Sequence, residues 1–168
     1  QIMHPAQTLD NNLGKIIRLH DDGRIPISNP YADMGFPANT IWTLGHRNVL
    51  GLSFAPNNDL WANEMGPLHG DELNLISKGE NYGWPLVSEG NHYSGAKIPN
   101  HSTRPEFAEP KLYWVPTIAP SGLVFYNGNE FPEWEGNAFI GGLKSRALIR
   151  IGFDDEKPFE AERFGWSQ

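Results

Sequence analysis

The residues best suited to bind a charged small molecule lie in two stretches, GHRNVLGLSF from Gly45 and WANEMGPLHGDELNLISKGENYGWP from Trp61. Arg47 and Asn48 place a guanidinium beside an amide, and a guanidinium pairs well with carboxylate and carbonyl oxygens. The second stretch offers backbone carbonyls at a Gly-Pro pair together with carboxylates, and calcium prefers such oxygen ligands. Together the two stretches indicate a polyanionic, carbonyl-rich quinone held beside a calcium ion.

Short β-strands separated by turns must position these residues. The chain has 18 glycines, 14 prolines and 6 tryptophans, and it shows no helical pattern longer than about two turns. Residues 26–40 and 79–110 are rich in turn formers, and they are expected to be loops, the second long and functional. The expected strands are 14–19, 41–44, 50–54, 60–64, 72–76, 122–126, 137–143, 147–153 and 159–164.

The spacing of the strands predicts an all-β fold that forms part of a β-propeller. Residues 122–164 contain four short antiparallel strands, which is the size of one blade. Residues 49–77 give three strands of a second blade, with the fourth expected at 111–115, and residues 14–45 supply part of a third. A β-sandwich shares this spacing and is the alternative fold. A closed propeller needs at least about four blades, so residues 1–168 are expected to be a single partial propeller domain.

Composition excludes several classes of function. The chain of 168 residues is 39% hydrophobic and carries a net charge of −7, which argues against binding to nucleic acid. It has no cysteine, which excludes disulfides, thiolate metal sites and a cysteine nucleophile. No apolar run reaches the ~20 residues of a membrane span. The abrupt ends of the sequence predict that the chain is a fragment of a longer protein.

Several motifs in order resemble one family. The pattern G-H-R-N followed by E-x-G-P-x-x-G-D-E-L-N-L-I-x-x-G-x-N-Y-G-W-P is similar to the soluble, pyrroloquinoline-quinone (PQQ)-dependent aldose sugar dehydrogenases of the glucose/sorbosone dehydrogenase family. Further matches are NHYSG at 91–95, PTIAPSG at 116–122 and FIGGLK at 139–144. The resemblance implies a six-bladed propeller with PQQ and Ca²⁺ on one face. It also implies that the quinone takes a hydride from the anomeric carbon of an aldose, giving a lactone.

The resemblance also implies roles for individual residues. Gly66 and Pro67 would hold the cofactor-side calcium through backbone carbonyls, whereas Glu72 and the main chain of Tyr82 would belong to a second calcium site. Each has an ordinary alternative, such as a Gly-Pro turn or a solvated carboxylate. The residues implied to contact the cofactor are Arg47, Asn48, Tyr93, Thr117 and Lys144. The ordinary alternatives, in the same order, are a surface salt bridge, a turn cap, an apolar lid, a turn hydroxyl and a solvated lysine.

The resemblance places the remaining machinery outside the chain. The base histidine is expected upstream of residue 1, and a quinone-gripping arginine pair is expected after Gln168, so the chain alone is predicted to be inactive. None of the six histidines has a close metal-ligand spacing, and His46 receives no catalytic role. Trp114 could stack on a planar ring or pack between blades. Asp71 could assist the metal or cap a turn.

Two rival functions stay open. Val49-Leu50 stands where the family often has Pro-Gln, which gives weight to a non-catalytic propeller that binds a sugar or a protein partner. A calcium lactonase is the other rival. The resemblance further implies an aldose substrate, an external electron acceptor, a possible homodimer and a periplasmic or secreted location.

Overall fold

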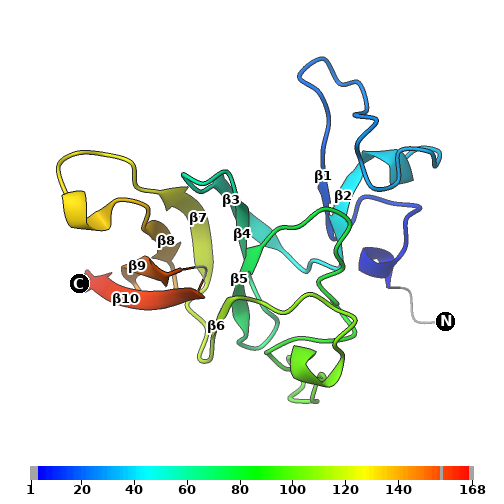
Figure 1. Cartoon of the computed structure of the whole chain (residues 1–168). Coiled ribbons are helices and arrows are strands. Elements are labelled where there is room, and N and C mark those ends of the chain that lie inside the picture. Colours follow the sequence, from blue (N-terminus) through cyan, green and yellow to red (C-terminus); the bar gives the residue numbers. More distant parts are fainter. Residues whose placement is uncertain (1–3, 156, 167–168) are drawn as a thin grey trace.

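The structure is a computed structural model that describes residues 4–155 and 157–166, so the expected domain limits at Gln1 and Gln168 lie outside the described residues. The described part is all-β, with one single-turn 3₁₀ helix before the first strand and three more between strands (Figure 1). These helices are Pro5–Gln7, Ala38–Thr40, His101–Thr103 and Pro132–Trp134. The strands are β1 (Lys15–Ile17), β2 (Ile41–Leu44), β3 (Val49–Phe54), β4 (Leu60–Glu64), β5 (Asp71–Leu75), β6 (Leu112–Trp114), β7 (Pro120–Phe125), β8 (Ala138–Gly142), β9 (Ala147–Asp154) and β10 (Lys157–Gly165).

The strands form two four-stranded antiparallel meanders and one two-stranded sheet. The orders are β3-β4-β5-β6, β10-β9-β8-β7 and β1-β2. All nine expected strands are present, and each begins and ends within two residues of its expected limits. Strand β6 is the fourth strand of the second blade, expected near 111–115. The partial β-propeller is therefore confirmed, with two complete blades. In the described residues the segment expected to give part of a third blade forms a two-stranded sheet.

The main core lies between the two complete blades. Trp114 belongs to this core at 5% exposure, and its Nε1 donates to Glu160 Oε2 of β10 at 2.8 Å. Trp114 is therefore a packing residue of the blades, one of the two alternatives its sequence position allowed. The buried core residues are Trp61, Leu73, Trp114, Ile118, Leu123, Phe125, Ala138, Ile140, Ala147, Ile149 and Ile151.

The innermost strands of the two blades approach closely at Gly51. A Cβ added there would lie 2.6 Å from the backbone nitrogen of Leu123 in β7, so Gly51→Ala forces the blades apart. We expect this variant to lower the free energy of unfolding by about 2 kcal/mol, measured by urea denaturation. Gly122→Ala is the matched control, because nothing lies within 4 Å of its added Cβ, and it should change the free energy by less than about 0.5 kcal/mol. Equal urea midpoints for Gly51→Ala and Gly122→Ala would contradict the close approach of the two blades at Gly51.

Antiparallel topology brings four connections to the same end of the sheets. The register pairs Val49 with Glu64 and Trp114 with Asp71, so the β2–β3, β4–β5 and β6–β7 connections share one end. Pairing of Pro120 with Gly142 adds the β8–β9 connection. We call these connections, residues 45–48, 65–70, 115–119 and 143–146, the loop end.

The long connection between β5 and β6 also reaches the loop end. It contains no strand among its described residues, as predicted, and it is anchored by isolated bridges of Leu44 to Asn81 and of Leu68 to Asn91. The second bridge brings this connection against the 65–70 turn. No helix in residues 4–155 and 157–166 is long and apolar enough to cross a membrane.

Candidate functional site

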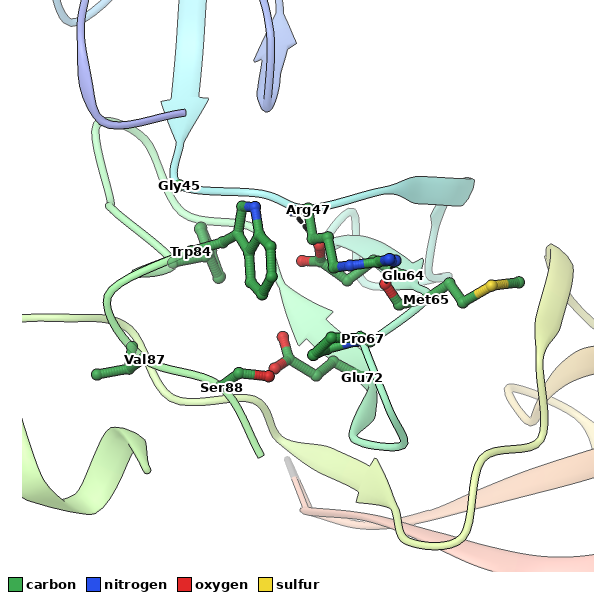
Figure 2. A pocket seen from close by; sticks show the side chains of 11 residues that line it. Gly45, Arg47, Glu64, Met65, Pro67, Glu72, Trp84, Val87 and Ser88 are labelled. Carbon is green, nitrogen blue, oxygen red and sulfur yellow. Dashed lines mark hydrogen bonds between the residues drawn. The ribbon is translucent and has the colours of Figure 1, made fainter. Parts of the chain in front are cut away.

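Arg47 projects from the β2–β3 connection over the loop end (Figure 2). Its Nη1 donates to the Met65 carbonyl at 2.8 Å, and its Nη2 donates to the Tyr93 hydroxyl at 3.3 Å. The guanidinium carbon lies 5.5 Å from the ring centroid of Trp84 and 5.9 Å from that of Tyr93. No carboxylate pairs with this guanidinium within residues 4–155 and 157–166. The surface salt bridge is therefore not the role of Arg47, and its charge is available to an anionic ligand.

A small hollow beside Arg47 brings the predicted metal ligands together. Gly66 and Pro67, expected at the cofactor-side calcium, and Glu72 and Tyr82, expected at a second calcium site, all line it. The residues of the two expected sites therefore share one hollow. Figure 2 shows the Glu72 carboxylate pointing into this hollow between Pro67 and Ser88, below the Trp84 ring. We call it the Glu72 hollow. Residues from the β2–β3 turn, the β4–β5 turn, strand β5 and the long connection thus meet at one place.

Two buried carboxylates face each other at the floor of this hollow. Glu64 and Glu72 are cross-strand partners, with 3% and 7% exposure. Asn74 Nδ2 donates to both carboxylates, at 3.0 Å to Glu64 and 3.2 Å to Glu72. Burial and the neighbouring Glu64 charge raise the pKa of Glu72 well above its usual range. The alternative of a solvated carboxylate for Glu72 is therefore wrong.

The charge of Glu64 is stabilised from the opposite side. Burial alone would raise the pKa of Glu64, but His46 and the backbone N–H groups of Arg47 and Asn48 hold it below its usual value. His46 Nδ1 lies 3.0 Å from Glu64 Oε1, and the Arg47 N–H donates to Oε2 at 2.7 Å. The His46 ring, whose Nε2 is 2.9 Å from the Thr43 hydroxyl, is 1% exposed. His46 therefore fixes the Arg47 turn and has no access to a substrate.

Tyr82 lines the hollow and is held by hydrogen bonds at both its hydroxyl and its carbonyl. Its hydroxyl donates to the Leu75 carbonyl at 2.5 Å and accepts the Ser77 N–H at 3.1 Å. Burial raises the pKa of Tyr82 to about 12, so its side chain is a neutral structural group. The buried His101 ring lies between two acceptors, the Tyr82 carbonyl at 3.1 Å and Glu89 Oε1 at 3.2 Å. Metal ligation through the Tyr82 backbone oxygen stays a prediction, and that oxygen is already within hydrogen-bond distance of His101 Nε2.

The residues that line the Glu72 hollow offer the carboxylates of Glu64 and Glu72 besides the backbone oxygens of the neighbouring turns. Among the described residues no group of three or more His, Cys, Asp or Glu side chains could hold a metal ion. Within the described residues the buried Glu72 carboxylate accepts one hydrogen bond, from Asn74. A buried carboxylate with spare lone pairs, beside the Gly66, Pro67 and Tyr82 main chain, fits a hard divalent cation such as calcium.

A second hollow lies at the loop end between the blades and contains Thr117 and Lys144. Asp71 holds this region to the first hollow. Its Oδ1 accepts the Gly66 N–H at 3.0 Å, and its Oδ2 accepts the Ile118 N–H at 2.8 Å and the Thr117 hydroxyl. The Lys144 N–H donates to the Ile118 carbonyl at 2.9 Å. Asp71 is therefore a turn cap, and it links the two hollows through the backbone.

The remaining cofactor candidates occupy different positions. Tyr93 is 71% exposed and reaches the site only through Arg47, so it is not a buried lid. Asn48 is exposed, and its backbone pairs with Glu64 and Met65. Lys144 is exposed in the β8–β9 turn.

Sequence reasoning missed Glu64 and its partner His46. A signal was available, because two strands at 60–64 and 72–76 joined by a short turn place Glu64 opposite Glu72. His69 was also missed, although it lines the second hollow.

Comparison with known proteins gives consistent matches. The family model described as Glucose / Sorbosone dehydrogenase matches residues 1–167. The aldose sugar dehydrogenase YliI of Escherichia coli is 42% identical over 163 residues, which are 94% of this chain and 43% of that protein. The crystal structure of the soluble aldose sugar dehydrogenase from Escherichia coli in the apo-form matches with a TM-score of 0.83 and 41% identity, covering 95% of this chain and 47% of that chain.

A third similar protein carries a cofactor. It is the PQQ-bound form of the aldose sugar dehydrogenase from Streptomyces coelicolor, with a TM-score of 0.71 and 31% identity, covering 95% of this chain and 41% of that chain. This chain therefore spans less than half the length of each of these relatives.

Proposed function

Since this chain belongs to the glucose/sorbosone dehydrogenase family, we propose that the complete protein is a PQQ- and calcium-dependent dehydrogenase that oxidises aldose sugars at C1 to lactones. One observation carries the proposal. Arg47 and the four candidate metal residues, Gly66, Pro67, Glu72 and Tyr82, come from four elements and line one hollow.

The groups at the loop end suit PQQ in charge and position. The cofactor has three carboxylates and an ortho-quinone, which pair with guanidinium and ammonium groups. Arg47 presents its guanidinium over Trp84 and Tyr93 without a carboxylate partner in the described residues, and the exposed Lys144 stands at the same end. When bound, PQQ would supply the hydride acceptor for the sugar. The role of Arg47 is to orient it, because a held guanidinium loses little freedom on binding.

Calcium binding is proposed on the chemistry of the Glu72 hollow. A cation there would neutralise Glu72, whose charge is otherwise disfavoured by burial and by Glu64. It would also draw the Gly66–Pro67 turn and the Tyr82 backbone together, which stabilises the floor beneath Arg47. We assign no catalytic base within residues 1–168. An external electron acceptor and a periplasmic or secreted location remain part of this proposal on family resemblance.

Calcium removal tests the proposal with the product of the complete open reading frame. After thorough chelation, dye-linked oxidation of glucose in the presence of PQQ should fall at least roughly tenfold, and added CaCl₂ should restore it. MgCl₂ at equal concentration is the control, because the smaller ion prefers octahedral geometry with retained water. Full activity after chelation would contradict calcium dependence. PQQ binding without oxidation of any aldose would favour the non-catalytic sugar-binding propeller.

A further inference from the structure

The second hollow contains a histidine in an unusual backbone conformation. His69 has φ of 72°, a left-handed value that non-glycine residues seldom adopt. This conformation directs its ring towards the β6–β7 connection, where His69 Nδ1 accepts the Thr117 N–H at 3.2 Å. The ring is half-buried and lines the hollow together with Lys144.

The hydrogen bond to Thr117 determines which ring nitrogen of His69 can donate. Since Nδ1 accepts an N–H, the proton of the neutral ring is on Nε2. Nε2 has no hydrogen-bond partner among the residues that the structure describes. His69 therefore lines a hollow at the loop end with a ring that is fixed through Nδ1 and has a free donor at Nε2.

Several other polar groups of the hollow are already engaged. The Thr117 hydroxyl has one proton, which it donates to Asp71, and its backbone N–H is donated to His69. Arg163 is paired with Glu160 through its Nε and its Nη2. Lys144 has no carboxylate partner within the described ranges. His69 Nε2 and the Lys144 ammonium can therefore receive an anion, as can the exposed Tyr113 hydroxyl at the rim of the same hollow.

We propose that His69 is a direct binding residue for a carboxylate of the cofactor, with Nε2 donating the hydrogen bond expected of the Thr117 hydroxyl. Thr117 then acts as a positioning residue, because its backbone fixes the ring and its hydroxyl is retained by Asp71. This inference rests on the proposed function, since it takes PQQ as the anion at the loop end. It assigns the contact to a residue that the family motif leaves variable, the second x of G-P-x-x-G-D-E.

Two substitutions of His69 separate its binding role from its structural one. In His69→Asn the side-chain oxygen can still accept the Thr117 N–H, as Nδ1 does, but no donor reaches the position of Nε2. In His69→Gln the longer amide can present its NH₂ near that position. Both are made in the product of the complete open reading frame, and PQQ affinity is measured by quenching of tryptophan fluorescence at fixed CaCl₂.

The Kd for PQQ should rise roughly tenfold in His69→Asn, the loss expected for one hydrogen bond to a charged group. It should return to within about threefold of the wild-type value in His69→Gln. The thermal midpoint of His69→Asn should equal that of the wild type, because asparagine tolerates positive φ. Wild-type affinity in His69→Asn, or equal weakening in both variants, overturns the inference.

PQQ binding by Arg47→Ala is measured in parallel. It shows whether a negative result refutes only the role of His69 or also refutes the proposed function. Weaker PQQ binding in Arg47→Ala with unchanged binding in His69→Asn refutes only the role of His69. Absence of PQQ binding in the wild-type protein refutes the proposed function, and the role of His69 with it.

Discussion

Replacing Arg47 with alanine should weaken PQQ binding by roughly 100-fold and should reduce dye-linked aldose oxidation to a similar extent at limiting cofactor. The guanidinium is held by the Met65 carbonyl and by the faces of Trp84 and Tyr93, so it is positioned before a ligand arrives. Its loss would remove the positioned cation that we propose pairs with a PQQ carboxylate, and lysine lacks the planar guanidinium that is held here. Fluorescence titration with PQQ measures the affinity, and Arg47→Lys should recover only a small part of it.

The matched control for this prediction is Arg18→Ala. The Arg18 guanidinium also lies over an indole, 4.8 Å from the ring centroid of Trp42 in β2. Arg18 directly follows β1 and lies outside the four connections of the loop end. Removing it eliminates a comparable cation–π contact without touching the site. PQQ affinity should be unchanged in Arg18→Ala. Equal loss of affinity in the two variants would mean that Arg47 acts only through the fold.

The strands were predictable because their signals are local. Alternating apolar residues, punctuated by glycine and asparagine turns, set the limits of β2 and β4 at the predicted residues. The spacing of the strands also predicted how they group into blades. The fourth strand of the β3–β6 blade lies at 112–114, after the long 79–110 connection. Burial of both faces of β5 was not predictable, since Glu72 and Asn74 look like an exposed polar face until the long connection covers them.

The course of the 79–110 connection could not be read from the sequence because it has no periodicity. Its place is set by contacts to distant residues, including the Leu68–Asn91 bridge and the bond of His101 to the Tyr82 carbonyl. Those contacts decide that Tyr82 joins Glu72 in one hollow. The residue identities at the candidate site were therefore predictable from motif, whereas their supporting partners, His46 and Glu64 above all, required the three-dimensional structure.

Replacing Glu72 with glutamine should remove the stabilisation of the protein by calcium. At a calcium concentration of about 100 times Kd, wild-type protein should gain about 2.7 kcal/mol in its free energy of unfolding. Glu72→Gln should gain almost nothing, because the substitution removes the charged ligand from the hollow that it shares with Gly66, Pro67 and Tyr82. Urea denaturation followed by tryptophan fluorescence, with and without CaCl₂, measures the difference.

Without calcium the same substitution should stabilise the protein at neutral pH. Burial and the Glu64 charge raise the pKa of Glu72 in the folded state, whereas the unfolded state has the ordinary value. A carboxyl group with a raised folded pKa loses stability as pH rises from the unfolded pKa towards the folded one, at about 1.4 kcal/mol per pH unit. In chelator, Glu72→Gln should therefore be more stable than wild type at pH 7, and this advantage should shrink as pH falls towards the ordinary carboxyl pKa of the unfolded state.

If Glu72→Gln is more stable than wild type in chelator but less stable in CaCl₂, Glu72 is a cation ligand. Replacing a merely structural glutamate would instead lower the stability of the protein in both buffers. Glu106→Gln is the matched control, since Glu106 is an exposed carboxylate paired with Arg104 and lies outside the Glu72 hollow. It should keep the full calcium response and change the free energy of unfolding by less than about 0.5 kcal/mol. An undiminished calcium response in Glu72→Gln would place the ion elsewhere. A loss of stability in chelator would show that the Glu72 charge is already compensated within the fold.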